Sequence, residues 1–401
     1  TGFYLLPYKW RVVWLLSLSY LFYLTWKPAF LLVLCGETVA AYWFGRIIAG
    51  SAGAKKKWLT ASVVSLLLPL VFFKYYNFLN GSLARLLANA QLESPFANQP
   101  YLIPLGVSYF TFQAISYVAD IYRGYLKPEA RIDQFALYMA FFPTILAGPI
   151  ERAKTMLKQL HTPVPFEYEN FRSGMQLILW GAFKKVVLAD RMKVFMDRVY
   201  ADPQSSPGIL VYFALAFSVF HLFCDFSAYS DIAVGSARIF GFQLTKNFDD
   251  RVYAAPSRTI FWQGWHRSLT SWLRDYVFLP LSRQARTQSR LYLNVLMVYI
   301  LVGVWHGATL GFLVWGSLNG LWLVLEAVTK KRRAAVFEKL GVNTEGGGFQ
   351  AFAWIFTFHI GIPFAAFFRT NTPAEAGTML ASLANSNLDL LGRWETKSCA
   401  M

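Results

Sequence analysis

Charged side chains are scarce in this sequence of 401 residues, of which only 15% are charged while 56% are hydrophobic and 18% are aromatic. A soluble chain carries about a quarter charged residues. Cysteine is scarce as well: Cys35, Cys224 and Cys399 show no metal-binding or redox spacing, and their odd number argues against a disulfide framework. The composition therefore excludes an ordinary soluble protein and a small disulfide-stabilised secreted one.

The sequence also lacks room for a soluble domain. Its longest polar connections, residues 80–100 and 329–348, hold about twenty residues each, whereas a domain needs about 50 or more. No internal repeat or pair of matching broken helices is visible, which weakens a transporter interpretation. We therefore expect one integral membrane domain over residues 1–401, whose machinery lies in the membrane or in short loops.

Long apolar runs are what the sequence has in place of polar segments. Val12–Trp26 and Ala29–Gly45 are short, but five other runs approach or exceed the length of a membrane span: Trp58–Leu79, Gln134–Ile150, Gly208–Cys224, Leu291–Val328 and Phe349–Phe368. They predict an all-α, multi-pass membrane protein. The chain opens at Thr1 with a stretch that is typical of the end of a preceding helix, and we expect both termini to be truncated.

The formal charge of +16 would suggest a nucleic-acid partner in a soluble protein. In a membrane protein the enrichment of Lys and Arg in cytoplasmic loops explains it better. The densest clusters are "KKK" at 55–57 and "KKRR" at 330–333, and both flank apolar runs. We assign both to the cytoplasmic side, where they meet anionic lipid headgroups, and expect no nucleic-acid partner.

The stretch "FWQGWHRSLTSWLRDY", residues 261–276, predicts an amphipathic helix at the membrane interface. Its aromatic residues fall on one side of a helical projection and its arginines on another. His266 interrupts the pattern because it falls on the apolar side. It is either a core histidine that bonds a backbone carbonyl or a histidine presented to a reaction chamber.

The run at 291–328 raises a similar question. As one helix, 38 residues would extend about 57 Å, nearly twice the ~30 Å hydrocarbon core. We expect a break at "GVWHGA", residues 303–308, beside a ribbon of glycines at 303, 307 and 311 that lets another helix approach. His306 lies in this uncharged stretch. An ionisable residue at membrane depth suggests a functional site, although a packing hydrogen-bond donor is the alternative.

Two further regions place polar residues among apolar ones. His221 and Asp225, spaced to share a helix face, predict a buried hydrogen-bond network or an irregular turn between two helices, but too few ligands for a metal. "PLGVSYFTFQAISYVADIYRG" (104–124) and "FFPTILAGPIER" (141–152) carry Pro, Gly and single charges. Irregular backbone at membrane depth is tolerated where it is buried or lines a cavity.

Together, "GVSYFTFQAISYVADIYRG", "FFPTILAGPIER", "CDFSAYSDIAVG", "NFDDRVY", "FWQGWHRSLTSWLRDYVFLPL" and "GVWHGATLGFLVWGSLNG" resemble the membrane-bound O-acyltransferases. They are most similar to the bacterial branch that contains the alginate O-acetylase, over about residues 10–370. The resemblance implies a helical bundle with interfacial and broken or re-entrant helices around a central intramembrane chamber. It also implies a multi-pass protein of the bacterial inner membrane.

The resemblance implies that His306 is the family's buried signature histidine and that His266 is the second motif histidine of this branch. Neutral histidine suits a general base near pH 7. His306 is therefore the expected base, His266 orients the donor or the reacting groups, and the helices around both should converge on one cavity. Further candidates for the chamber lining are Trp262, Trp265, Trp305, Arg274, Asp275, Asp225 and Tyr229.

No tightly bound cofactor or metal is expected. The acyl donor would be a thioester, acetyl-coenzyme A or an acyl carrier, and no G-x-S-x-G serine is visible, so direct transfer is the default. Three functions remain open: polysaccharide O-acetylation, D-alanyl transfer from a carrier to teichoic acid, and proton-coupled transport of a lipid or acyl donor. Because no loop can cradle several sugar rings, we expect a separate extracytoplasmic acetyltransferase-like or esterase-like partner to modify the polysaccharide.

Overall fold

The computed structural model describes residues 2–93, 96–98, 103–249 and 252–386. Within these residues every regular element is a helix. Six of the described helices are long and apolar enough to cross a membrane: α3 (Ala29–Gly50), α4 (Lys55–Asn89), α11 (Gly208–Ile239), α15 (Gln288–His306), α16 (Leu310–Lys339) and α17 (Gly347–Arg369). The chain is therefore an all-α, multi-pass membrane protein, as its composition predicts.

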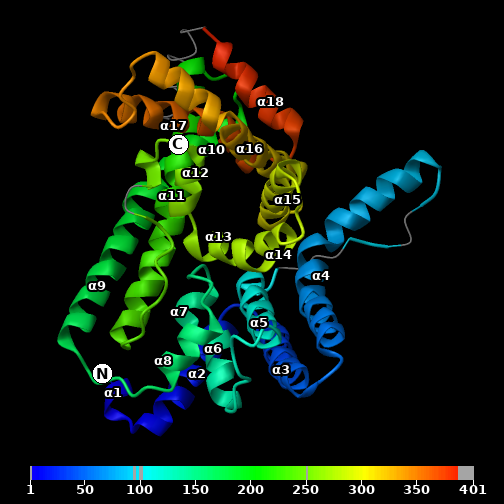
Figure 1. Ribbon diagram of the computed structural model, residues 1–401, viewed down its shortest axis with the longest axis vertical. Coiled ribbons are helices and arrows are strands. Elements are labelled where there is room, and N and C mark those ends of the chain that lie inside the picture. The colour runs from blue at the N-terminus through cyan, green and yellow to red at the C-terminus, as the bar shows by residue number, and fades with distance from the viewer. Residues whose placement is uncertain (1, 94–95, 99–102, 250–251, 387–401) are drawn as a thin grey trace. The chain divides into compact units, whose positions relative to one another are not determined.

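The chain divides into two compact units, residues 1–179 with 229–246 and residues 180–228 with 247–401. The single domain expected from the sequence stays a prediction. In the first unit, α3, α4 and α5 pack against one another (Figure 1). Its other helices are α1 (Gly2–Leu5), α2 (Tyr8–Leu24), α5 (Val107–Tyr122), α6 (Ile132–Ala140), α7 (Phe142–Ile145) and α8 (Ala153–Leu160).

The second unit holds the rest of the chain, and α9 (Tyr168–Phe183) and α11 each run from one unit into the other. Besides α15, α16 and α17, it contains η1 (Lys184–Ala189), α10 (Asp190–Ala201), η2 (Val252–Ala254), α12 (Arg258–Gly264), α13 (Arg267–Leu273), η3 (Arg274–Phe278), α14 (Leu279–Ser282), α18 (Pro373–Ala381) and η4 (Ser382–Ala384). Cys35 and Cys224 are free thiols, and Cys399 lies outside the described residues.

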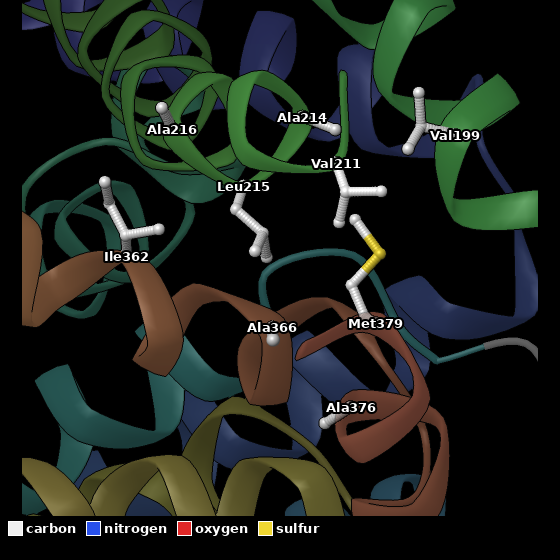
Figure 2. Packing of buried hydrophobic residues seen from close by; sticks show 9 residues of the cluster. All are labelled: Val199, Val211, Ala214, Leu215, Ala216, Ile362, Ala366, Ala376 and Met379. Carbon is white, nitrogen blue, oxygen red and sulfur yellow. The ribbon is translucent and has the colours of Figure 1, made fainter. Parts of the chain in front are cut away.

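A buried apolar cluster holds α10, α11, α17 and α18 of the second unit together. Figure 2 shows its members: Val199, Val211, Ala214, Leu215, Ala216, Ile362, Ala366, Ala376 and Met379. Four of the nine are alanines, and small side chains let helices approach closely where lipid removes the hydrophobic driving force. The cluster thereby sets α11 against α17, the two helices that supply one side of the cavity described below.

The run at 291–328 breaks where the sequence predicts. Helix α15 ends at His306, Gly307 is extended, and α16 begins at Leu310 after Thr309, whose hydroxyl caps the new helix by accepting from the backbone N–H of Phe312. The helices then pack side by side because Gly303 and Gly316 face each other. A Cβ at Gly316 would lie 2.9 Å from the Cα of Gly303, closer than carbon atoms can pack.

Two local predictions were wrong. The run Gln134–Ile150 is not one span but the short helices α6 and α7, because Pro143 has no N–H for the carbonyl four residues earlier and the backbone leaves the helix at Phe141. The polar connections are also shorter than expected. Helix α4 continues to Asn89 and α16 continues to Lys339, so "KKRR" lies on the last turns of a helix.

The Trp-rich stretch is not one amphipathic helix either. It breaks between α12 and α13, where Trp265 is extended and His266 is left-handed with φ 44°. Asn247 holds this break: its backbone carbonyl accepts from the N–H of Arg267 at 2.8 Å, and its side-chain oxygen accepts from the Ser268 hydroxyl at 2.7 Å. These tertiary bonds replace the helical ones and override the sequence pattern.

Candidate active site

His306 is the last residue of α15, so its side chain stands where the helix ends. The glycine after it continues the chain in an extended conformation that cannot close another helical turn. The last carbonyls of a helix carry partial negative charge, which stabilises a cation there. The sequence thus places the imidazole of His306 at a helix end, next to carbonyls that carry partial negative charge.

A cavity of about 330 Å³ opens beside His306 within the second unit. This volume is at the lower end of the range for small-molecule sites, roughly 300–1,000 Å³. It can hold the reacting ends of two substrates but not a polymer. The lining residues come from α11, η2, α12, α15, α16 and α17 and are Ser218, Val219, His221, Leu222, Tyr253, Arg258, Phe261, Trp262, Trp265, His306, Trp315, Gly361, Phe364, Ala365, Phe368 and Arg369.

Aromatic rings surround the imidazole of His306. The ring centroids of Trp305, Trp315 and Phe368 lie 4.8, 5.1 and 5.2 Å from its own, and the ring of Phe312 stacks on it at 5.9 Å. An aromatic wall of this kind limits the access of water to the ring. An attacking hydroxyl in this pocket would meet an oriented imidazole in a low-dielectric environment.

His266 lies beside this cavity but is not one of the residues that line it. Its side chain is buried, with 1% of its surface exposed, and its ring packs against Phe226 at 4.6 Å and Trp305 at 6.0 Å. Trp305 contacts the rings of both histidines. The sequence led us to expect that both histidines line one cavity. His306 does line it, whereas His266 lies behind it and packs against Trp305, which in turn contacts His306.

Asn247 orients the imidazole of His266. The Nδ1 atom lies 3.4 Å from the Asn247 side-chain oxygen, which also accepts from the Ser268 hydroxyl. Because that oxygen can only accept, Nδ1 carries the proton of the neutral ring and Nε2 keeps its lone pair. Burial, and secondarily the proximity of His306, lowers the pKa of His266 well below its usual range, so this histidine is neutral at pH 7.

The other candidates from the sequence divide into two groups. Trp262 and Trp265 line the cavity. Trp305 does not line it but contacts the ring of His306, which does. The remaining four are not among the lining residues: Arg274 and Asp275 pair with each other at 2.9 Å, Asp225 pairs with Lys185 at 2.7 Å, and Tyr229 belongs to the first unit.

His221 is a cavity residue that the sequence prediction placed elsewhere. The stretch at 221–235 was expected to form a hydrogen-bond network or an irregular turn, but α11 passes through it without a break. His221 faces the cavity while Asp225, one turn later, bonds Lys185. Among the described residues the buried Nε2 atom of His221 has no hydrogen-bond partner. The cavity therefore holds a second imidazole besides that of His306.

Two arginines also line the cavity, and among the described residues Arg369 alone forms an ion pair with a carboxylate. Arg369, at the end of α17, pairs with Asp197 of α10 and lies over the ring of Tyr200. Arg258, at the start of α12, donates to the side-chain oxygen of Asn319 at 2.6 Å and lies over the ring of Phe261. Burial lowers the pKa of the Arg258 guanidinium to about 10, which leaves it charged at pH 7. No sequence motif marked either arginine.

This set of residues suits proton transfer near a polarised carbonyl. A histidine can accept the proton of a hydroxyl, aromatic walls exclude water, and cations can stabilise negative charge. Nothing in the arrangement requires a serine nucleophile.

Comparison with known proteins agrees with this chemistry. Residues 130–365 match the membrane-bound O-acyltransferase family. The chain is 33% identical to a probable alginate O-acetylase of Pseudomonas aeruginosa over 98% of this chain and 72% of that protein. It is 29% identical to a peptidoglycan O-acetyltransferase of Helicobacter pylori, over 94% and 74%, and 28% identical to a teichoic acid D-alanyltransferase of Streptococcus thermophilus, over 69% and 67%.

Proposed function

Since the chain belongs to the membrane-bound O-acyltransferase family and is an O-acyltransferase, we propose that it moves an acetyl group from a thioester donor to a hydroxyl in the cavity of the second unit, with His306 as general base. The observation that carries the proposal is the position of His306, which lines the cavity from the end of α15 inside an aromatic wall. A histidine kept only for packing would need no such opening.

The proposed reaction is a direct transfer. His306 takes the proton of the acceptor hydroxyl as its oxygen attacks the thioester carbonyl carbon; a C–O bond forms and the C–S bond breaks. The imidazolium then returns the proton to the departing thiolate. The carbonyls at the end of α15 stabilise the imidazolium between the two proton transfers. His266 supports Trp305 and thereby the position of the His306 ring.

Acetyl fits the cavity better than D-alanyl, the acyl group in the name of the Streptococcus thermophilus relative. A D-alanyl ester carries an ammonium group at neutral pH. In this cavity it would meet the guanidinium of Arg258, for which the described residues supply no carboxylate partner. Two like charges in a low-dielectric cavity repel each other by several kcal/mol at an effective dielectric constant of ~20. The names of the relatives from Pseudomonas aeruginosa and Helicobacter pylori favour acetyl as well.

The helices indicate which side of the membrane the cavity faces. Trp315 lines the cavity near the start of α16, and Lys330 begins the "KKRR" cluster on the same helix. Fifteen helical residues separate them, about 22 Å. If "KKRR" is cytoplasmic, as its charge predicts, the cavity lies toward the extracytoplasmic side of the proposed location, the bacterial inner membrane.

A relay to a partner follows from this orientation. We propose that a thioester donor, acetyl-coenzyme A or an acyl carrier, delivers the acetyl group, and that an acetyltransferase-like or esterase-like partner outside the membrane places it on a cell-envelope polysaccharide or exopolysaccharide. The cavity volume supports a relay because about 330 Å³ cannot hold several sugar rings. The purified chain with donor should leave polymer unmodified, and added partner should restore modification; efficient O-acetylation by the chain alone would rule the relay out.

Replacement of His306 by alanine tests the catalytic proposal. A general base contributes roughly 10²–10⁴-fold, so His306→Ala should lower thiol release from acetyl-coenzyme A by about that factor while thermal stability in detergent changes little. The matched control is His359→Ala, because His359 is an exposed histidine on α17 that bonds Tyr212 away from the cavity. The control should keep normal turnover. Wild-type turnover in His306→Ala would disprove the role of the base.

The same assay separates the enzyme from a transporter. Thioester turnover by the purified protein, without a membrane gradient, is expected of an acyltransferase and not of a proton-coupled carrier. Labelled acetyl and D-alanyl thioesters offered in parallel would show which acyl group leaves the donor.

A further inference from the structure

Arg258 is a buried cation that forms no direct ion pair with a carboxylate among the described residues. Its side chain is 7% exposed. One nitrogen donates to Asn319, and the Nε atom has no hydrogen-bond partner among the described residues. A buried charge is costly unless a partner neutralises it.

Glu326 lies close enough to act on the Arg258 charge, but its carboxylate oxygens already accept other hydrogen bonds. Its two carboxylate oxygens accept from the backbone N–H groups of Arg258 and Thr259, from the Thr259 hydroxyl and from the indole N–H of Trp322. The carboxylate thus caps the start of α12 and leaves the guanidinium toward the cavity. Arg369 differs from Arg258 because it forms an ion pair with Asp197.

The guanidinium is also held in place. Asn319 binds it at 2.6 Å, its carbon lies 4.3 Å from the centroid of the Phe261 ring, and the backbone of Gly361 lies so close that an added Cβ would be 3.3 Å from a guanidinium nitrogen. Asn319 is itself anchored, since its amide donates to the Trp315 carbonyl. A fixed guanidinium suits planar, bidentate recognition of a carboxylate or a phosphate.

We infer that Arg258 and Asn319 form an anion-binding subsite of the cavity, which holds a phosphate or carboxylate group of one of the two substrates while the acetyl group is transferred at His306. This inference rests on the proposed function and adds to it the substrate class: at least one substrate is anionic. Arg258 contacts the anion, and Asn319 is a positioning residue that fixes the guanidinium.

Two donors with the same thioester distinguish the source of the anion. Acetyl-coenzyme A carries phosphates and acetyl-pantetheine carries none, and thiol release from each is measured in membrane vesicles that contain the acceptor. If the anion belongs to the donor, Arg258→Gln lowers kcat/KM at least tenfold with acetyl-coenzyme A and leaves acetyl-pantetheine unaffected. If it belongs to the acceptor, the variant loses the same factor with both donors.

Inorganic phosphate separates anion binding from a structural role. Phosphate should inhibit the wild type and should inhibit Arg258→Gln much less, a difference that a folding defect does not produce. Arg258→Lys should retain part of the phosphate sensitivity because it keeps the charge. Asn319→Ala should weaken phosphate inhibition while raising KM more than it lowers kcat. The matched control Arg290→Gln, at an exposed arginine near the start of α15, should behave as the wild type.

The inference is overturned if Arg258→Gln keeps wild-type kcat/KM with both donors, or if it loses activity while wild-type turnover is insensitive to phosphate. Its failure is separable from failure of the proposed function. An inactive His306→Ala beside a fully active Arg258→Gln would remove the anion subsite alone, whereas an active His306→Ala would remove the proposed base whatever Arg258 does.

Discussion

Gly316 is a position where a single added methyl group should disturb the candidate active site. A Cβ there would lie 2.9 Å from the Cα of Gly303 and would overlap the carbonyl oxygen of Tyr299. The contact with the Tyr299 oxygen would be 2.4 Å, whereas carbon and oxygen atoms pack at about 3.3 Å, so α16 must move away from α15 by roughly 0.9 Å. Overpacking of this kind costs about 1–3 kcal/mol of folding free energy. Trp315, which precedes Gly316 and lines the cavity, must move with it.

The expected loss of activity follows from that displacement. A misplacement of about 1 Å can cost ~100-fold in rate, so a shift of nearly that size should cost between about tenfold and 100-fold in kcat. Thermal unfolding in detergent and thiol release from acetyl-coenzyme A measure the two effects. The control is Gly377→Ala on α18, where an added Cβ meets nothing within 4 Å. Gly316→Ala with wild-type stability and turnover would refute the close packing of α15 and α16.

Three further predictions concern the cavity and its supports. His221→Gln should lower kcat, by less than loss of His306, because it removes the second imidazole of the cavity; unchanged kinetics would leave His221 without a role. His266→Asn should be more stable than His266→Ala in thermal unfolding because asparagine tolerates a left-handed backbone, yet both should lose turnover. Burial alone would raise the pKa of Asp197, but the bonds from Lys193 and Arg369 hold that pKa below its usual value. The carboxylate therefore stabilises the fold above about pH 4 and loses that contribution as the pH falls further. The difference in stability between the wild type and Asp197→Asn should accordingly shrink in acid.

Periodicity and length were enough to predict the membrane class and the break after His306. The run at 291–328 is too long for one span, and its glycines allow both the break and the close packing that the structure shows. The failure at Gln134–Ile150 has a local cause that the sequence contained, Pro143. The failure at 261–276 does not, because the bonds from Asn247 that break the helix join residues about twenty positions apart.

The residues that line the cavity were harder to predict, because contacts between residues far apart in the sequence decide which side chains face it. His306 and two tryptophans were identified from their own stretches. Arg258 becomes notable only once the structure shows that the carboxylate of Glu326 bonds other groups. His221 could have been found from its i,i+4 spacing to Asp225, had their helix been assigned as continuous. Charge compensation and helix continuity are tertiary properties, and composition does not contain them.

The contact between Gly303 and Gly316 also bears on ion permeability. A protonatable imidazole inside a membrane protein could let protons leak across the membrane. Each elementary charge that crosses a potential of 100 mV dissipates about 2.3 kcal/mol. Where two backbones touch, no file of water molecules can pass between the helices, and without water protons cannot hop along that seam. The glycine pair thus closes the seam next to His306 to water and protons, which a protonatable base at the proposed position requires.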